Sequence, residues 1–112
     1  MRSFNIELAE HGEATHVLLS GDLDLSTAKH AEQAIQDAER SGHRTVVVDL
    51  RRLSFMDSTG LRVIVSADKR ARRMNRRVVI IQGPAAVRRV FEITRLDESL
   101  DIVDTPEEIE QT

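Results

Sequence analysis

The sequence contains no cysteine, tryptophan or tyrosine, and only three of its 112 residues are phenylalanine. Without cysteine the chain has no disulfide framework, no thiolate nucleophile and no sulfur ligand for zinc. With so few aromatic rings, we do not expect a platform on which the bases of single-stranded nucleic acid could stack. These absences exclude several classes of function.

Long apolar runs are also absent. No stretch approaches the roughly 20 apolar residues that a membrane span requires, and the first seven residues lack the apolar segment of a signal peptide. We therefore expect a soluble cytoplasmic protein without direct membrane contact. The net charge of −3 gives no general attraction to nucleic acid or anionic lipid. A chain of this size fits a single domain, residues 1–112, with one core.

The first part of the chain predicts a hairpin followed by a helix. Apolar and polar residues alternate over residues 4–8, a turn surrounds Gly12, and residues 16–20 form a second strand-like segment. Residues 25–27 include two hydroxyl residues that could cap a helix, and Gly42 ends it. The small apolar residues of this helix indicate close packing on a sheet.

The rest of the chain alternates strands with helices. Residues 45–50 and 77–81 are continuous apolar runs, typical of strands covered on both faces by helices. Further expected elements are a helix at about 59–74, a helix beginning at Pro84, a short strand at 100–103 and a helical tail at 106–109. This order predicts an α/β fold with a mixed sheet of about four to five strands. Its N-terminal hairpin is antiparallel, the remainder is parallel, and about four helices flank it.

The segment 55–61, Phe-Met-Asp-Ser-Thr-Gly-Leu, stands where a strand gives way to a helix. Asp57 can cap the helix with its carboxylate, and Gly60 allows another backbone to approach closely. The residues predicted to face the sheet are Leu61, Ile64, Ala67, Ala71 and Met74. The opposite, solvent-facing stripe is predicted to contain Ser58, Arg62, Ser66, Lys69 and Arg73.

Ser58 is therefore expected to be exposed at the start of the helix. A phosphate on its hydroxyl would lie at the positive end of the helix dipole and one turn from Arg62, so modification need not unfold the protein. Val63 is expected beside Thr59 as an exposed apolar residue suited to an interface. The alternative remains open that the Asp-Ser-Thr sequence at residues 57–59 is only a helix cap.

Other patterns point to no enzyme chemistry. Residues 69–77 are rich in arginine, which could form a nucleic-acid patch, but cations at a helix C-terminus also complement the helix dipole. The four histidines lack metal-ligand spacing, and no Walker loop or Gly-x-Ser-x-Gly elbow is present. Asp49 and Asp57 could be compared with the phospho-acceptor aspartate of a receiver domain, but the first strand ends without the paired acids that the metal site of such a domain needs. We expect no metal, no cofactor, no catalytic residue and no intrinsic enzyme activity.

The segment 55–61, the Gly-Asp-Leu-Asp sequence at 21–24 and residues 83–91 together resemble the STAS family, specifically the stand-alone bacterial anti-sigma factor antagonists. The resemblance covers nearly the whole chain and implies the STAS fold. It implies that Ser58 is phosphorylated by a partner that is both anti-sigma factor and serine kinase, and dephosphorylated by a metal-dependent serine/threonine phosphatase. The unmodified form would bind the anti-sigma factor and free a sigma factor, whereas the phosphorylated form would not bind.

This chain departs from the family pattern at two positions. Thr59 replaces a second serine found in many relatives, which makes it a secondary candidate for phosphorylation, and Arg62 replaces a residue that is commonly small. We expect a monomer when free, with partner contacts from Asp22, Asp24, Ser26, Asp57, Ser58, Thr59, Gly60, Arg62, Val63 and Ser66. Asp22 and Asp24 could alternatively serve only the first helix's N-terminus. A second reading is a STAS subunit of a membrane transport or lipid-trafficking complex that docks a transporter ATPase.

Overall fold

A computed structural model describes residues 3–111 as five strands that form one mixed sheet with three α-helices and two 3₁₀ segments. The sheet order is β1-β2-β3-β4-β5, with β1 antiparallel to β2 and every other neighbouring pair parallel. The predicted mixed sheet is confirmed, with three α-helices in place of about four. The elements are β1 (Asn5–His11), β2 (Ala14–Leu23), α1 (Ala28–Glu39), β3 (Thr45–Met56), α2 (Ser58–Arg73), β4 (Arg77–Ile81), α3 (Ala85–Ile93), η1 (Leu96–Glu98), β5 (Ile102–Val103) and η2 (Pro106–Gln111).

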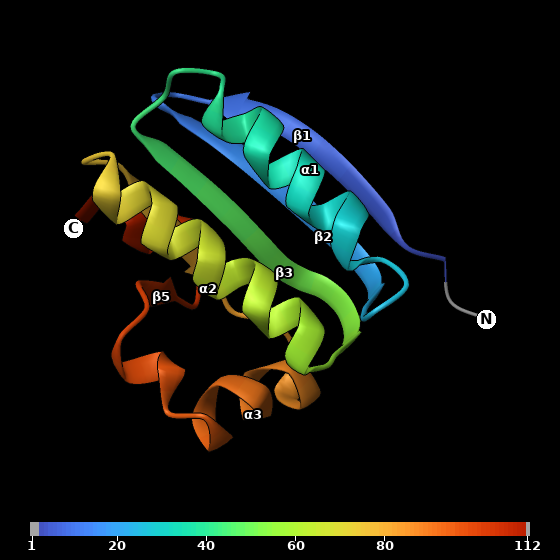
Figure 1. The fold of residues 1–112 in the computed structure, drawn as a ribbon. Coiled ribbons are helices and arrows are strands. Elements are labelled where there is room, and N and C mark those ends of the chain that lie inside the picture. The colour runs from blue at the N-terminus through green and yellow to red at the C-terminus, as the bar shows by residue number, and fades with distance from the viewer. Residues whose placement is uncertain (1–2, 112) are drawn as a thin grey trace.

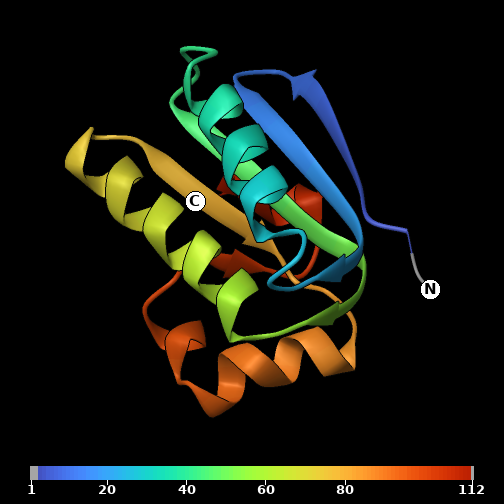
Figure 2. The same cartoon turned by 45° about the vertical axis from the view of Figure 1, so that its right-hand side comes forward.

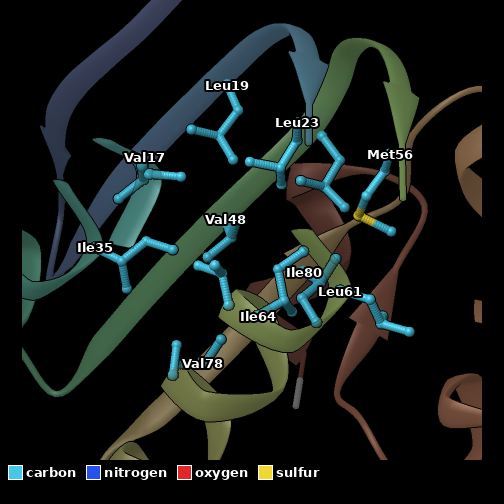
Figure 3. Close-up of a cluster of buried hydrophobic side chains, with 14 of the residues drawn as sticks. Val17, Leu19, Leu23, Ile35, Val48, Met56, Leu61, Ile64, Val78 and Ile80 are labelled. Carbon is cyan, nitrogen blue, oxygen red and sulfur yellow. The ribbon is translucent and has the colours of Figure 1, made fainter. Parts of the chain in front are cut away.

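The main core lies between the sheet and the α-helices. Helices α1 and α2 run side by side over one face, and α3 lies at the end of the molecule where α2 begins (Figures 1 and 2). Ile35 of α1, Ile64 of α2 and Phe91 of α3 are fully buried in one cluster. Figure 3 shows the first two of these beside Val48 and Ile80 from the central strands. This core fixes the position of both helix starts relative to the strand ends.

The opposite face of the sheet is covered differently. Its smaller cluster contains Val47, Val79, Ile81 and Val103, packed against Ala14 and Ile109, the last from η2. The prediction that α-helices cover both faces of the central strands is wrong. Parallel strands joined by right-handed crossovers in a single direction, from β2 to β5, place every connecting helix on the same side. The other side is therefore left to a 3₁₀ segment.

Helix α2 begins where the sequence predicts but differs in two side chains. Leu61 and Ile64 are buried as expected, whereas Met74 follows the last helical residue and is 66% exposed. Val63, expected to be exposed, is only 8% exposed and belongs to the main core. Because α2 contacts α1 and α3 as well as strands, its buried stripe is wider than a helix resting on a sheet alone would need.

Candidate functional site

The candidate site lies where β2 and β3 end together. The pairing of these two strands continues to Asp22 opposite Phe55 and Leu23 opposite Met56. One residue further, the backbone N–H of Asp57 donates to the carbonyl oxygen of Leu23 at 3.2 Å. The segment that leads into α1 and the segment that leads into α2 are thus held side by side.

Asp57 caps α2 as predicted. Its Oδ1 accepts from the backbone N–H of Thr59 at 2.9 Å and from that of Gly60 at 3.1 Å. The close approach predicted at Gly60 is also present, because a Cβ there would lie 2.7 Å from Leu23 Cγ and 2.9 Å from the Leu23 carbonyl oxygen. The first turn of α2 therefore rests directly on the end of β2.

Ser58 is the first residue of α2 and is exposed, as predicted. Its hydroxyl makes no hydrogen bond to any part of the chain that the structure describes. Arg62, one helical turn further along, is also exposed, whereas Thr59 is half-buried. Ser58 consequently offers the more accessible of the two hydroxyls for modification or for contact with a partner.

The segment before α1 is ordered by its own side chains. Asp24 Oδ1 accepts from the backbone N–H of Ser26 at 2.9 Å and from its hydroxyl at 2.7 Å. These hydrogen bonds, led by that from the hydroxyl, hold the pKa of Asp24 below its ordinary value, so its carboxylate is charged at neutral pH. The segment thus presents a fixed negative charge.

The predicted hydroxyl residue stands at the N-cap of α1, but it does not cap the helix through its side chain. Thr27 occupies the N-cap position, but its hydroxyl makes no capping hydrogen bond to the helix. It donates instead to the carbonyl oxygen of Asp22 at 2.8 Å and accepts from the backbone N–H of Asp24 at 2.9 Å. The hydroxyl therefore closes the turn that precedes the helix.

Two exposed apolar residues at this end of the sheet were missed by the sequence reasoning. Leu25, between Asp24 and Ser26, is 79% exposed, and Phe55 is 44% exposed. The sequence carried no signal for Phe55, because strand alternation would place it on the same face as buried Leu53. A register shift between β2 and β3, which leaves Ser54 unpaired between Leu53 and Phe55, breaks this alternation. Large apolar side chains left in water beside a polar site are typical of the anchors of protein interfaces.

The residues that were expected to contact a partner are not all exposed at the end of the sheet where β2 and β3 finish. The structure brings Asp22, Asp24 and Ser26 to the same end of the sheet as Asp57 to Gly60, with Arg62 exposed on the next turn of α2. Gly60 and Val63 are buried, so the prediction that these two residues contact a partner is wrong. Ser66 is half-buried, two turns from Ser58. We call the exposed surface formed by Asp24, Leu25, Ser26, Phe55, Ser58 and Arg62 the serine face.

The serine face has the chemistry of a recognition surface. It combines an accessible hydroxyl with a charged carboxylate, one guanidinium and two apolar side chains. Within residues 3–111 no group of three acidic, histidine or cysteine side chains could hold a metal ion. None of the helices in that part of the chain combines the length and hydrophobicity needed to cross a bilayer.

Comparison with known proteins gives consistent matches over nearly the whole chain. The STAS domain family model matches residues 5–109. The anti-sigma-B factor antagonist of Staphylococcus aureus is 29% identical over 100 residues, which cover 89% of this chain and 93% of the relative.

Solved structures match at the level of the fold. An anti-sigma factor antagonist from Mycobacterium paratuberculosis has a TM-score of 0.83 at 26% identity, covering 95% of this chain and 90% of that one. The Bacillus cell fate determinant SpoIIAA in its phosphorylated form has a TM-score of 0.70 at 24% identity, covering 97% of this chain and 98% of its own.

Proposed function

Because this chain belongs to the STAS domain family, we propose that it acts as an anti-sigma factor antagonist that binds its partner through the serine face. The relatives named as antagonists match it over nearly their full length, which supports a stand-alone regulator over a subunit of a larger transport complex. As an antagonist it would act by binding and not by catalysis. We place it in the cytoplasm on the basis of this role in transcription.

The observation that carries the proposal is the placement of Ser58. An exposed hydroxyl that makes no hydrogen bond to the described residues stands at the start of α2, beside a second loop that carries a fixed carboxylate and an exposed leucine. In its unmodified state this surface offers apolar anchors and polar groups that a protein partner could cover. We propose that Ser58 is the switch residue and that Thr59, half-buried, is a secondary acceptor.

Phosphorylation of Ser58 would change the charge of the surface without rebuilding it. A phosphoserine adds about −1.5 to −2 charges at neutral pH, and the start of a helix accommodates negative charge. Arg62, one turn away, is placed to hold the phosphate on the free protein. The fold would stay intact while the partner would meet a different surface.

The electrostatic effect on binding is large enough for a switch. A unit charge brought to about 4 Å from a like charge costs about 4 kcal/mol at an effective dielectric near 20. Half of that would weaken binding by more than about tenfold. Asp24 and Asp57 already make the surroundings of Ser58 acidic, so a partner that accommodates them would have little capacity for further negative charge.

The proposed switch needs one enzyme that phosphorylates Ser58 and another that removes the phosphate. We propose an anti-sigma factor that is also a serine kinase, and a metal-dependent serine/threonine phosphatase that restores the free hydroxyl. SpoIIAA of Bacillus, one of the structural relatives, has been solved in a phosphorylated form, which supports covalent modification of this chain.

The modification is tested directly by mass spectrometry. The protein is incubated with ATP and each anti-sigma kinase of its own cell, and the phosphate is then located in the chain. We expect phosphate on Ser58. Absence of phosphate from both Ser58 and Thr59 with every kinase would remove the switch while leaving binding itself to be measured.

Binding is tested by calorimetry with the partner that phosphorylates the protein. We expect Ser58→Ala to bind like the unmodified protein and Ser58→Asp to bind at least about tenfold more weakly. Ser99→Asp is a matched control, since Ser99 is exposed and follows η1, far along the chain from the serine face. Equal affinities for the alanine and aspartate variants at position 58 would contradict the charge mechanism.

A further inference from the structure

A second charged surface lies at the other end of the molecule, where α2 ends and β3 and β4 begin. Here the turn of the β1–β2 hairpin, the residues before β3 and the residues between α2 and β4 surround a cleft of about 670 Å³. We call it the basic cleft. Its lining residues are Glu13, Gly42, His43, Arg44, Thr45, Arg72, Asn75, Arg76 and Arg77.

The basic cleft is strongly positive in a chain whose net charge is −3. Four arginines line it against a single glutamate. Arg72 donates from Nε to Asp68 at 2.8 Å, and Arg77 forms an ion pair with Asp101, so both are partly neutralised. Their remaining charge adds to that of two arginines that have no carboxylate partner within residues 3–111.

Those two are Arg44 and Arg76. Arg76 donates to the backbone carbonyl oxygen of Glu39 and forms no ion pair with a carboxylate in the part of the chain that the structure describes. The side chain of Arg44 makes no hydrogen bond or ion pair with any residue in the range 3–111. Nothing in the fold of that range requires a guanidinium at position 44.

The dipole of α2 explains only part of this cluster. Arg72 lies in the last turn of the helix, where a cation is favoured. Arg44 instead precedes β3 and Arg77 begins β4, and the backbone N–H of Arg77 donates to the Arg44 carbonyl oxygen at 2.8 Å. Arg77 has Asp101 as its carboxylate partner, whereas the structure shows no carboxylate partner for Arg44 within residues 3–111. An anion bound in the cleft would compensate the charge of Arg44.

The lining indicates the chemistry of that anion. Guanidinium groups bind phosphate through paired, charge-assisted hydrogen bonds, and several of them around one cleft favour more than one phosphate. The volume falls within the range of about 300–1,000 Å³ typical of small-molecule sites. The acidic chain as a whole disfavours the long polyanionic surface of a nucleic acid.

We propose that the basic cleft binds a small anion that carries two or more linked phosphate groups, with Arg44 and Arg76 as its principal ligands. The site is separate from the serine face, because the 16 residues of α2 separate the two ends by about 24 Å. Phosphate binding here and partner binding at Ser58 are therefore compatible. The inference does not depend on the proposed function.

The test uses inorganic pyrophosphate and isothermal titration calorimetry on the full chain. Arg44→Gln is expected to weaken binding, and the double variant with Arg76→Gln is expected to weaken it by at least about tenfold. Arg89→Gln is the matched control, since it removes the same charge from an exposed position on α3 outside the cleft. Loss of binding confined to the cleft variants supports the site. No binding, or equal binding by all variants, overturns it.

Protein stability is followed alongside because Arg76 also contacts the backbone at Glu39. Arg44→Gln removes no hydrogen bond or ion pair in the described chain, so unchanged thermal unfolding with weakened binding isolates ligand recognition. Amide shifts in NMR spectra should locate pyrophosphate at the residues that line the cleft. Shifts centred on the start of α2 instead would contradict the assignment.

Comparison of anions identifies the source of the phosphate groups. Orthophosphate should bind more weakly than pyrophosphate. Equal affinities for the two anions would show that the cleft binds only one phosphate group, contrary to the proposal. Binding of long-chain polyphosphate or duplex DNA without binding of pyrophosphate would also overturn it. Ser58→Asp should leave the pyrophosphate affinity unchanged, which separates a failure here from a failure of the proposed function.

Discussion

Replacing Asp57 by alanine should destabilise the start of α2 and with it the whole fold. The substitution removes the carboxylate oxygen that accepts from two backbone N–H groups, those of Thr59 and Gly60. Loss of an N-cap acceptor typically costs about 0.5–2 kcal/mol, and a cap that serves two donors belongs in the upper half of that range. We therefore expect the free energy of unfolding to fall by about 1–2 kcal/mol.

This loss is measurable as a change in melting temperature. For a domain near 100 residues, each kcal/mol shifts the melting temperature by about 4 °C, so the expected decrease is roughly 4–8 °C. Far-UV circular dichroism during heating follows the transition, and urea titration gives the free energy independently. Because α2 packs against the core, the effect should appear in the global unfolding transition.

Asp57→Asn is the control that separates capping from charge. Asparagine keeps an acceptor oxygen and caps helices about as well as aspartate, so it should lose only the dipole contribution of about 0.3–1 kcal/mol. If asparagine destabilised the protein as much as alanine, the geometry of the cap would not be the cause. An alanine variant as stable as the parent would refute the reasoning altogether.

Three further predictions follow from the same structure. Gly60→Ala should lower the free energy of unfolding by up to about 2 kcal/mol in urea titrations, because overpacking against Leu23 costs about 1–3 kcal/mol and helix propensity returns about 1 kcal/mol. Leu25→Ser and Phe55→Ser should each change stability by no more than about 0.5 kcal/mol but weaken calorimetric binding to the anti-sigma factor by about tenfold or more. His16→Gln should reduce the loss of stability on acidification, measured as urea midpoints over a pH series.

The sign of the His16 effect follows from its surroundings on the second face of the sheet. Burial, followed by the charge of His11, holds the pKa of His16 below its ordinary value of 6.5, although Asp49 acts in the opposite direction. The unfolded chain therefore binds this proton more readily, so stability falls as the pH decreases from 6.5 through the folded pKa. Parallel pH profiles for the parent and the glutamine variant would contradict this assignment.

The interface prediction has its own control. Met74→Ser changes an equally exposed apolar residue at the far end of α2, where 66% of the methionine is accessible. It should leave binding to the anti-sigma factor unchanged. If Met74→Ser weakened binding as much as Leu25→Ser, general surface hydrophobicity and not the serine face would be responsible.

Much of the fold could be predicted because local pattern and tertiary environment agree. Alternation of side chains around a turn at Gly12, which has a φ of 63°, identified the hairpin. Continuous apolar runs identified β4 and the first half of β3. The second half of β3 was missed because Arg51 and Arg52 are exposed and interrupt the apolar run, although backbone pairing with β2 continues to Met56.

The sequence predicted where the candidate site lies along the chain better than it predicted which of the side chains there are exposed. The position of Ser58 follows from the helical phase of α2, which Leu61 and Ile64 fix. Val63 was placed wrongly because a helical wheel assumes one neighbouring layer, whereas α2 also contacts α1 and α3. Leu25 is exposed because it lies in the turn that Asp24 and Thr27 close with their hydrogen bonds. The spacing of apolar residues in the sequence does not predict such a turn.

The hydrogen bond between Asp57 and Leu23 has a consequence for how recognition specificity could be transferred or diversified. It fastens two loops into one unit, in which Gly60 also packs so closely on the same leucine that an added methyl group would force a shift. A chimera that receives only one loop from a paralogue would join mismatched halves. Exchanging residues 21–27 and 55–62 as a matched pair should preserve both folding and the donor's choice of partner.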